Sequence, residues 1–165
     1  MKILVFSDSH RYMANMRHIV EKHGNNVGCV LHLGDGCEDA LQLSRLMPEV
    51  RFEWVRGNCD YSFELAEKLL TLEGKKLLMT HGHKYHVKSD YQRIVYAALE
   101  REVDACFFGH SHQPAVFYEN GIFFMNPGSI SLPRAASLPS YGVVDISESG
   151  VGGEWLEIDS SLKKE

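Results

Sequence analysis

Successive apolar runs in this chain end in aspartate, asparagine or histidine, most of them next to a glycine. The clearest case is Gly109-His110-Ser111-His112, which follows the apolar run 105–108. Two histidines at positions i and i+2 on extended backbone project to the same side, so His110 and His112 are candidate metal ligands. A chain that repeats such strand ends needs a fold in which the ends meet.

The apolar periodicity of the first third predicts alternating strands and helices. Strands are expected over 2–6, 27–33 and 51–55, and helices over 13–20 and 40–47, with Gly24 and Pro48 as stops. This βαβαβ order favours a parallel sheet whose strand carboxyl ends lie along one edge. Open α/β sheets place their binding sites at that edge.

The second half has the spacing of hairpins. Strand pairs are expected at 65–72 with 76–80 and at 115–119 with 122–125, and two last strands near 141–146 and 154–158. Ser89 or Asp90 can cap a helix whose core-facing residues are Ile94, Val95, Ala98 and Leu99. We expect one domain over residues 1–165, with 160–165 as a frayed tail.

Charge and cysteine usage restrict the partners. The net charge of −5 without a basic cluster argues against a long nucleic acid, although a metal site can still attract a small anionic substrate. The four cysteines show no Cys-x-x-Cys spacing, and neither a signal peptide nor a membrane-spanning stretch is expected. These features predict a reduced, cytoplasmic protein without a membrane partner, and leave a homo-oligomer open.

Other strand ends add candidate ligands. Asp8 and His10 follow the first strand, Asp35 lies between two glycines, Asn58 follows Gly57, and His81 precedes Gly82. Each motif alone is weak, because an Asp-Gly or Asn-Cys-Asp sequence is usually a turn. Their joint occurrence at successive strand ends indicates one composite site.

These motifs resemble those of the calcineurin-like metallophosphoesterases, which run D-x-H, G-D, G-N-[H/C]-[D/E], H-G and G-H-x-H. The resemblance spans nearly the whole chain. The small size, Cys59 and the later Asn126-Pro127-Gly128-Ser129 resemble the compact YfcE-type phosphodiesterase branch, which also includes the non-catalytic retromer subunit. The resemblance implies an α/β fold in the form of a four-layer α/β/β/α sandwich.

The resemblance also implies a centre of two divalent metals. Asp8, His10 and His112 would hold one metal, Asn58, His81 and His110 would hold the other, and Asp35 would bridge them. Imidazole and carboxylate ligands suit Mn, Fe, Ni, Co or Zn, of which Mn is expected here. Two such metals about 3.5–4 Å apart can activate a bridging hydroxide for in-line attack on a phosphate ester, so no protein nucleophile is required.

The expected activity is hydrolysis of small phosphodiesters, with a phosphomonoesterase or nucleotide phosphatase as the alternative. A non-catalytic interaction scaffold is a third possibility, against which the complete ligand set argues. Asn58 and His83 are the expected catalytic residues, His83 as a proton donor or a phosphate contact.

Three neighbouring features have more than one possible role. Cys59 is an expected substrate contact, at the position where larger relatives carry a histidine that would protonate the leaving group. Asp60 would orient Asn58 or a metal-bound histidine, or form only a turn. The Asn126 segment either faces substrate or is a simple turn, and His32 is expected to be packed rather than ligating.

Overall fold

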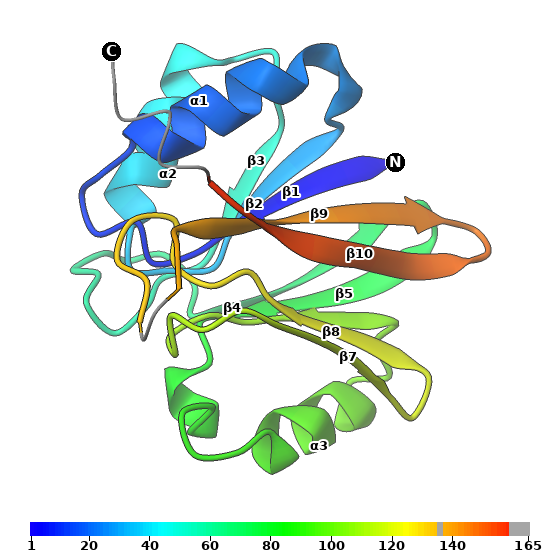
Figure 1. Ribbon diagram of the computed structural model, residues 1–165. Coiled ribbons are helices and arrows are strands. Elements are labelled where there is room, and N and C mark those ends of the chain that lie inside the picture. Colours follow the sequence, from blue (N-terminus) through cyan, green and yellow to red (C-terminus); the bar gives the residue numbers. More distant parts are fainter. Residues whose placement is uncertain (135–136, 159–165) are drawn as a thin grey trace.

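The computed structural model of the chain describes residues 1–134 and 137–158. Two five-stranded sheets lie face to face, with helices α1 and α2 above one sheet and α3 below the other (Figure 1). This arrangement confirms the predicted four-layer sandwich. The expected frayed tail at 160–165 lies outside the described residues.

The first sheet has the strand order β10-β9-β1-β2-β3. Its strands are β1 (Lys2–Phe6), β2 (Cys29–His32), β3 (Phe52–Trp54), β9 (Ser140–Ser147) and β10 (Gly150–Glu157). Strands β1, β2 and β3 run parallel, as the βαβαβ order predicted, whereas β9 runs antiparallel to β1 and β10 to β9. The C-terminal hairpin β9–β10 therefore extends the first sheet next to β1, with β10 at its edge.

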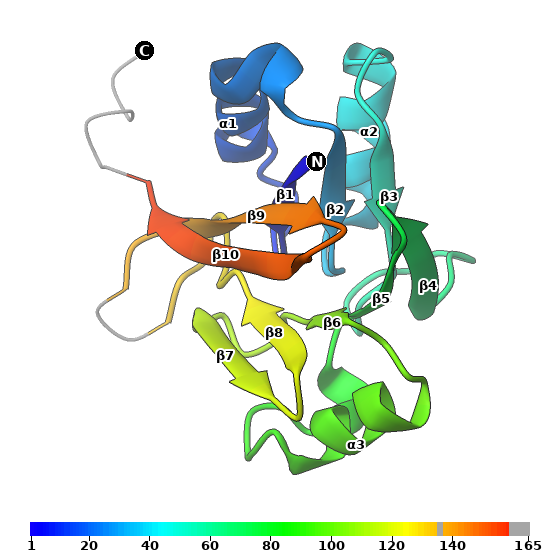
Figure 2. The same cartoon turned by 90° about the vertical axis from the view of Figure 1, so that its right-hand side faces the viewer.

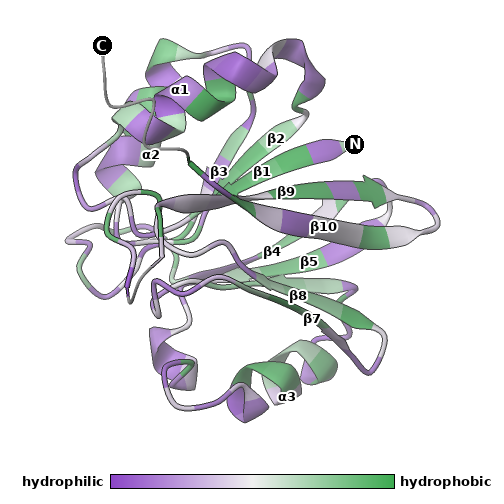
Figure 3. Ribbon diagram, viewed as in Figure 1, coloured by the Kyte–Doolittle hydropathy of each residue, from purple (hydrophilic) through white to green (hydrophobic). Residues whose placement is uncertain are grey.

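Strand β1 is buried on both faces, which explains its uninterrupted apolar sequence. Ile3 and Val5 point into the core between the two sheets, whereas Leu4 and Phe6 pack against the helices. These helices are α1 (Ala14–His23), followed by the short 3₁₀ turn η1 (Gly24–Asn26), and α2 (Cys37–Leu46). Figure 3 shows the result, with apolar strands inside and polar residues on the outward side of the helices.

The second sheet has the strand order β4-β5-β6-β8-β7. Its strands are β4 (Glu67–Leu72), β5 (Lys75–Thr80), β6 (Ala105–Phe107), β7 (Ala115–Glu119) and β8 (Ile122–Asn126). The two predicted hairpins, β4–β5 and β7–β8, are confirmed as antiparallel pairs, while β5, β6 and β8 are parallel. Figure 2 shows β7 and β8 beneath the β9–β10 hairpin of the first sheet.

Helix α3 (Gln92–Glu100) covers the outer face of the second sheet, after the short 3₁₀ turn η2 (His83–Tyr85). Ile94, Val95 and Ala98 are buried as predicted, but Leu99 is 38% exposed. The prediction for Leu99 was wrong because the helix directs Ala97, rather than Leu99, into the buried face together with Ile94, Val95 and Ala98. Among the described residues, no helix has the length and apolar character needed to cross a membrane.

The start of α3 also differs from the prediction. Tyr91, rather than Ser89 or Asp90, occupies the N-cap position and makes no side-chain capping bond. Asp90 still supplies an acceptor, since the backbone N–H of Gln92 donates to its carboxylate at 2.9 Å. The capping oxygen therefore comes from one residue before the N-cap.

Both sheets direct strand carboxyl ends to one edge of the molecule, on the side away from the N-terminus in Figure 1. The loops after these strands bond to one another. Asp8 N–H donates to Gly34 O at 3.0 Å within the first sheet's loops, and Gly109 N–H donates to His81 O at 2.9 Å within the second's. The candidate ligands are therefore brought together by the sheet topology.

Candidate metal centre

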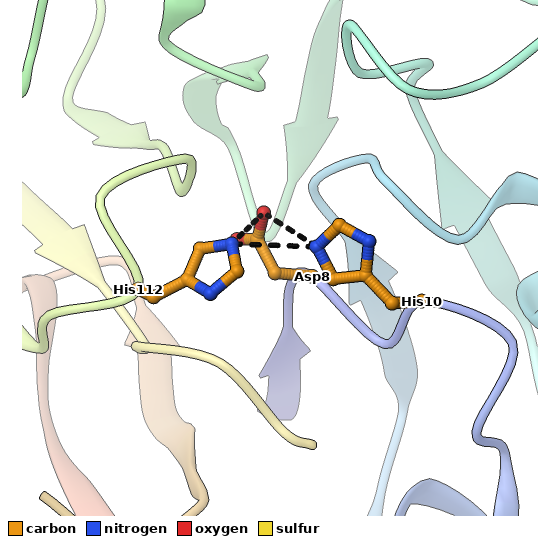
Figure 4. A group of neighbouring side chains, drawn as sticks. All are labelled: Asp8, His10 and His112. Atoms are coloured by element: carbon orange, nitrogen blue, oxygen red, sulfur yellow. Dashed lines mark hydrogen bonds and ion pairs between the residues drawn. The ribbon is translucent and has the colours of Figure 1, made fainter. Parts of the chain in front are cut away.

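The first group of ligand atoms comes from both sheets. Asp8 and His10 follow β1, and His112 follows β6, and the three side chains face one another (Figure 4). Asp8 Oδ1 lies 3.2 Å from His112 Nε2 and 3.9 Å from His10 Nε2, and the two imidazole nitrogens are 3.3 Å apart. Atoms that share a metal at about 2.0–2.2 Å lie about 3–4 Å from each other, so this spacing fits one divalent ion.

A second group surrounds His81 at the end of β5. Its Nε2 atom lies 3.1 Å from Asn58 Oδ1, 3.2 Å from His110 Nδ1 and 3.3 Å from Asp35 Oδ2. These are again the separations expected of atoms around one metal. The seven predicted ligands therefore form two adjacent groups.

Asp35 lies between the two groups. Its Oδ2 atom is 3.3 Å from His81 Nε2 in the second group and 3.9 Å from His10 Nε2 in the first. Its other oxygen accepts a hydrogen bond from the backbone N–H of Cys59 at 2.8 Å. One carboxylate is thus fixed so that it faces both groups.

Backbone carbonyls orient two of the imidazoles. His81 Nδ1 lies 2.8 Å from Leu33 O, and His112 Nδ1 lies 2.6 Å from Leu132 O. A carbonyl can only accept, so Nδ1 carries the proton and Nε2 presents its lone pair to the site. Metal-bound histidines are oriented in this way.

Asp8 provides the test of whether a cation fits. Its Oδ2 atom accepts hydrogen bonds from Ser7 Oγ and from the backbone N–H of His110. Its Oδ1 atom is buried and accepts no hydrogen bond from any residue that the structure describes. A buried carboxylate oxygen without a partner is costly, and a metal ion at the centre of the first group would compensate it.

The electrostatics also favour positive charge here. Burial raises the pKa of Asp8 and Asp35, but the imidazoles of His112 and His81 more than compensate and hold both carboxyl pKa values below their usual range. Burial opposes the charging of His81, yet the contact with Asp35 raises its pKa. Burial and the neighbouring His81 lower the pKa of His110 to about 4.

Five of the seven predicted ligands have a positive φ angle. The φ angles are 55° at Asp8, 46° at His10, 53° at Asp35, 69° at His110 and 57° at His112. Each costs about 1–2 kcal/mol in an L-residue, and such strain is concentrated at functional sites.

The extended backbone predicted for His110 and His112 is therefore wrong. The turned backbone lets the N–H of His110 reach Asp8, and it sends the two imidazoles to different groups. Glycine is required beside them, since a Cβ on Gly109 would lie 2.0 Å from Ser7 Oγ.

Residues 1–149 match the family model of the calcineurin-like phosphoesterase superfamily domain. The chain belongs to this family. It is 33% identical over 148 residues to the probable metallophosphoesterase YsnB of Bacillus subtilis, covering 88% of this chain and 85% of YsnB. It is 34% identical over 102 residues to the phosphodiesterase YfcE of Escherichia coli, covering 55% of this chain and 50% of YfcE.

Solved structures agree on the fold. A predicted phosphoesterase from Streptococcus pneumoniae superposes with a TM-score of 0.82 at 30% identity, over 96% of this chain and 92% of that one. The Zn²⁺ complex of Vps29 from Entamoeba histolytica superposes with a TM-score of 0.74 at 20% identity, over 96% and 100% of the two chains. The predicted resemblance to the YfcE-type branch that includes the retromer subunit is confirmed.

In this calcineurin-like chain, Asp60 holds the loop that carries Asp35. Its carboxylate accepts hydrogen bonds from the backbone N–H groups of Asp35, Gly36, Cys37 and Gly57, at 2.7–3.0 Å. Burial raises the pKa of Asp60, but the hydrogen bonds from Gly57, Cys37 and Asp35 lower it below the usual range. Its hydrogen bonds go to this loop, and not to Asn58 or a histidine, so it positions Asp35 through the backbone.

Cys59 and His83 both border the phosphoesterase centre. Cys59 is exposed, and its Sγ lies within 4.8 Å of ligand atoms of His10 and Asp35. The half-buried ring of His83 has its centroid 5.4 Å from that of His81 and 6.0 Å from that of His110. Both residues are therefore close enough to meet a substrate bound at the centre.

A cleft of about 700 Å³ opens beside the first ligand group. His10, Asp35 and Cys59 line it where it meets the centre, and Arg11 and Tyr61 are also among its lining residues. This volume lies in the range of small-molecule sites. The cleft is therefore a candidate binding site for a small molecule beside the ligand groups.

The segment that begins at Asn126 is not a substrate-facing turn. Asn126 and Ser129 are fully buried. The Asn126 amide donates to Gly109 O at 3.0 Å, and the Ser129 hydroxyl donates to Asp8 O at 2.8 Å. The segment supports two ligand loops from behind, a role for which the Asn-Pro-Gly turn sequence offers no signal.

His32 is packed, as predicted, but its partners were not foreseen. It contacts Ser9, which in turn contacts Asp39 on α2. Nothing in the sequence around His32 or Asp39 predicts that the two are linked through Ser9. A histidine inside an apolar strand is commonly a packed core residue, and an acidic residue in a first helical turn commonly stabilises the helix dipole.

Proposed function

We propose that this phosphoesterase-family protein is a two-metal phosphodiesterase that acts on small phosphate esters. The observation that carries the proposal is the position of Asp35 Oδ2 between two groups of ligand atoms, each with the spacing of a metal site. Two metals that share one carboxylate suit the displacement of a group from phosphorus.

The proposal divides the seven ligands between two metals in the way that the family resemblance implies. Asp8, His10 and His112 would hold one metal, Asn58, His81 and His110 would hold the other, and Asp35 would lie between them as a shared ligand. We propose manganese for both, although Fe, Ni, Co or Zn would suit the same ligands. Two divalent ions outweigh the charge of the two carboxylates, and the neutral Asn58 preserves the excess that attracts an anionic substrate.

The metals would supply an activated water and stabilise the charge that develops on the phosphate oxygens. The chain's own residues supply orientation. The carbonyls of Leu33 and Leu132 fix the tautomers of His81 and His112, and the loop bonds of Asp60 fix Asp35. Asn58, besides binding metal, presents its amide to the bound phosphate.

Leaving-group departure involves Cys59 and His83. Burial and the nearby His81 lower the pKa of His83, so its imidazolium form is a stronger proton donor than an exposed one, although less of it is present at neutral pH. Partial desolvation and the adjacent Asp35 raise the pKa of the exposed Cys59, so its thiol stays neutral at the substrate face. A neutral thiol is a poor proton donor, so we assign substrate contact to Cys59 and proton donation to His83.

The four cysteines are free thiols, which supports the proposal that the protein works in the reducing cytoplasm. The oligomeric state, which the sequence leaves open, stays open. The non-catalytic scaffold stays a prediction. Vps29 shares the fold, but a similarity of 20% identity shows the fold alone.

The test uses metal-stripped protein to which Mn²⁺ is returned. Hydrolysis of bis(p-nitrophenyl) phosphate should appear only with metal and should exceed that of p-nitrophenyl phosphate. Faster turnover of the monoester would favour the phosphomonoesterase alternative. Two bound metals without turnover of either ester would favour the scaffold.

A further inference from the structure

Behind the proposed centre, three buried polar side chains form a hydrogen-bonded chain that the proposed function does not use. His32 at the end of β2, Ser9 after β1 and Asp39 in the first turn of α2 are 1%, 0% and 6% exposed. His32 Nε2 lies 3.0 Å from Ser9 Oγ, and the Ser9 hydroxyl donates to Asp39 Oδ2. Most polar groups buried this deeply have hydrogen-bond partners, and a fully satisfied network of them holds the chain in one conformation.

The direction of each hydrogen bond follows from its neighbours. The backbone N–H of Gly34 donates to His32 Nδ1 at 3.2 Å, so the ring proton lies on Nε2 and points to Ser9. Ser9 accepts that bond and donates its own hydrogen to Asp39. Asp39 Oδ2 also accepts the backbone N–H of Arg11 at 3.0 Å. The hydrogen bonds therefore run from His32 through Ser9 to Asp39, whose carboxylate accepts from both Ser9 and Arg11.

This chain of bonds holds the turn that carries two proposed ligands. Ser9 lies between Asp8 and His10, and the φ angles of Asp8, His10 and Arg11 are 55°, 46° and 66°. A left-handed turn of non-glycine residues persists only where its surroundings hold it. The fit is close, because a Cβ on Gly36 would lie 1.9 Å from Ser9 Oγ.

We propose that His32, Ser9 and Asp39 are positioning residues that hold Asp8 and His10 toward the first of the two metals. This inference rests on the proposed two-metal function. The second metal's ligands come from other loops with other supports, such as the Leu33 carbonyl that orients His81. Loss of Asp39 should therefore weaken binding of the first metal and leave the affinity for the second metal unchanged.

The experiment measures Mn²⁺ binding by calorimetry in two backgrounds that each keep one metal. His81→Ala removes a ligand of the second metal, and His112→Ala removes a ligand of the first. In the His81→Ala background, adding Asp39→Ala should weaken Mn²⁺ binding by about 10–100-fold, the range for residues that orient metal ligands. In the His112→Ala background it should leave Mn²⁺ affinity unchanged.

Two further variants separate positioning from general damage. Asp39→Asn keeps an oxygen that can accept from Ser9 and Arg11, so it should restore most of the affinity. Glu38→Ala removes the exposed carboxylate next to Asp39 in the same helical turn and should have no effect. If Asp39→Ala does not fold, as judged by circular dichroism, Ser9→Ala interrupts the same chain of bonds.

Equal losses in both backgrounds, or no loss in either, would overturn the inference. Its failure differs from failure of the proposed function. A parent protein that binds two Mn²⁺ ions and hydrolyses no ester contradicts the function and leaves the binding experiment intact. A parent that hydrolyses phosphodiesters, with normal first-site binding in the Asp39→Ala variant, contradicts the inference alone.

Discussion

Asp60→Asn tests how much the Asp60 carboxylate stabilises the Asp35 loop, because this carboxylate accepts four backbone hydrogen bonds. One oxygen accepts the backbone N–H groups of Gly36 and Cys37, and the other accepts those of Asp35 and Gly57. In asparagine one of these oxygens becomes an NH₂ group, which cannot accept. Whichever way the amide turns, two N–H groups lose their acceptor.

The structure sets the size of the effect. A hydrogen bond to a charged group contributes about 1.5–3 kcal/mol, so two lost bonds amount to about 3–6 kcal/mol. Water can reach the half-buried Asp60, so we expect the lower end, about 3 kcal/mol. For a chain of this length each kcal/mol shifts Tm by about 2–4 °C, which predicts a fall of about 6–12 °C.

The pH dependence has a definite sign. The folded-state pKa of Asp60 is lowered, because the hydrogen bonds from Gly57, Cys37 and Asp35 outweigh the effect of burial. Its contribution to the free energy of unfolding is therefore full above the unfolded pKa of about 3.9, and is lost as the pH falls through the lower folded value. The difference between parent and variant should be constant at neutral pH and shrink only below about pH 4.

The assay is thermal unfolding by circular dichroism at pH 7 with a chelator, so that metal binding does not contribute. Asp104→Asn is the matched control, because Asp104 accepts one backbone N–H, from Lys76 at 2.7 Å, and an amide oxygen can keep that bond. Its Tm should stay near that of the parent. A fall for Asp60→Asn no larger than that of the control would refute the reasoning.

Three further predictions concern the centre itself. Asp35→Asn should abolish most activity and release metal, measured by turnover and elemental analysis; two retained metals with near-normal turnover would contradict the bridging role. His112→Ala and His81→Ala should each impair a different one of two sites in a metal titration, and identical defects would contradict the partition. Because proton donation is assigned to His83, the rate of the parent should depend only weakly on leaving-group pKa, and His83→Ala should make this dependence steep by slowing alkyl esters selectively, within the roughly 10²–10⁴-fold range of general acid catalysis. A steep dependence in the parent that His83→Ala does not change would contradict the role of His83 and indicate a missing acid at Cys59, in which case Cys59→His should accelerate alkyl esters more than nitrophenyl esters.

Much of the fold could be predicted because its signals are local. The apolar run of β1, the helix stops at Gly24 and Pro48, and the hairpin of 115–119 with 122–125 each depend on a few neighbouring residues. The candidate ligands could be predicted for the same reason, since each follows a strand. Parallel strands then bring their carboxyl ends together without further information.

What escaped prediction depends on contacts between distant segments. The division of His110 and His112 between two groups follows from a left-handed backbone that Asp8, about a hundred residues away, helps to hold. The burial of Asn126 and the bond from Ser9 to Asp39 likewise arise only after the sheets pack. No periodicity in the sequence reports such tertiary hydrogen bonds.

The position of bound metal tests the central claim most directly. Crystals soaked in Mn²⁺ would be measured at the manganese absorption edge, where anomalous difference density identifies the ions. We predict two peaks about 3.5–4 Å apart, with Asp35 between them. One peak should be coordinated by Asp8, His10 and His112, and the other by Asn58, His81 and His110. A single peak, or two peaks bound by other residues, would contradict the two-metal centre.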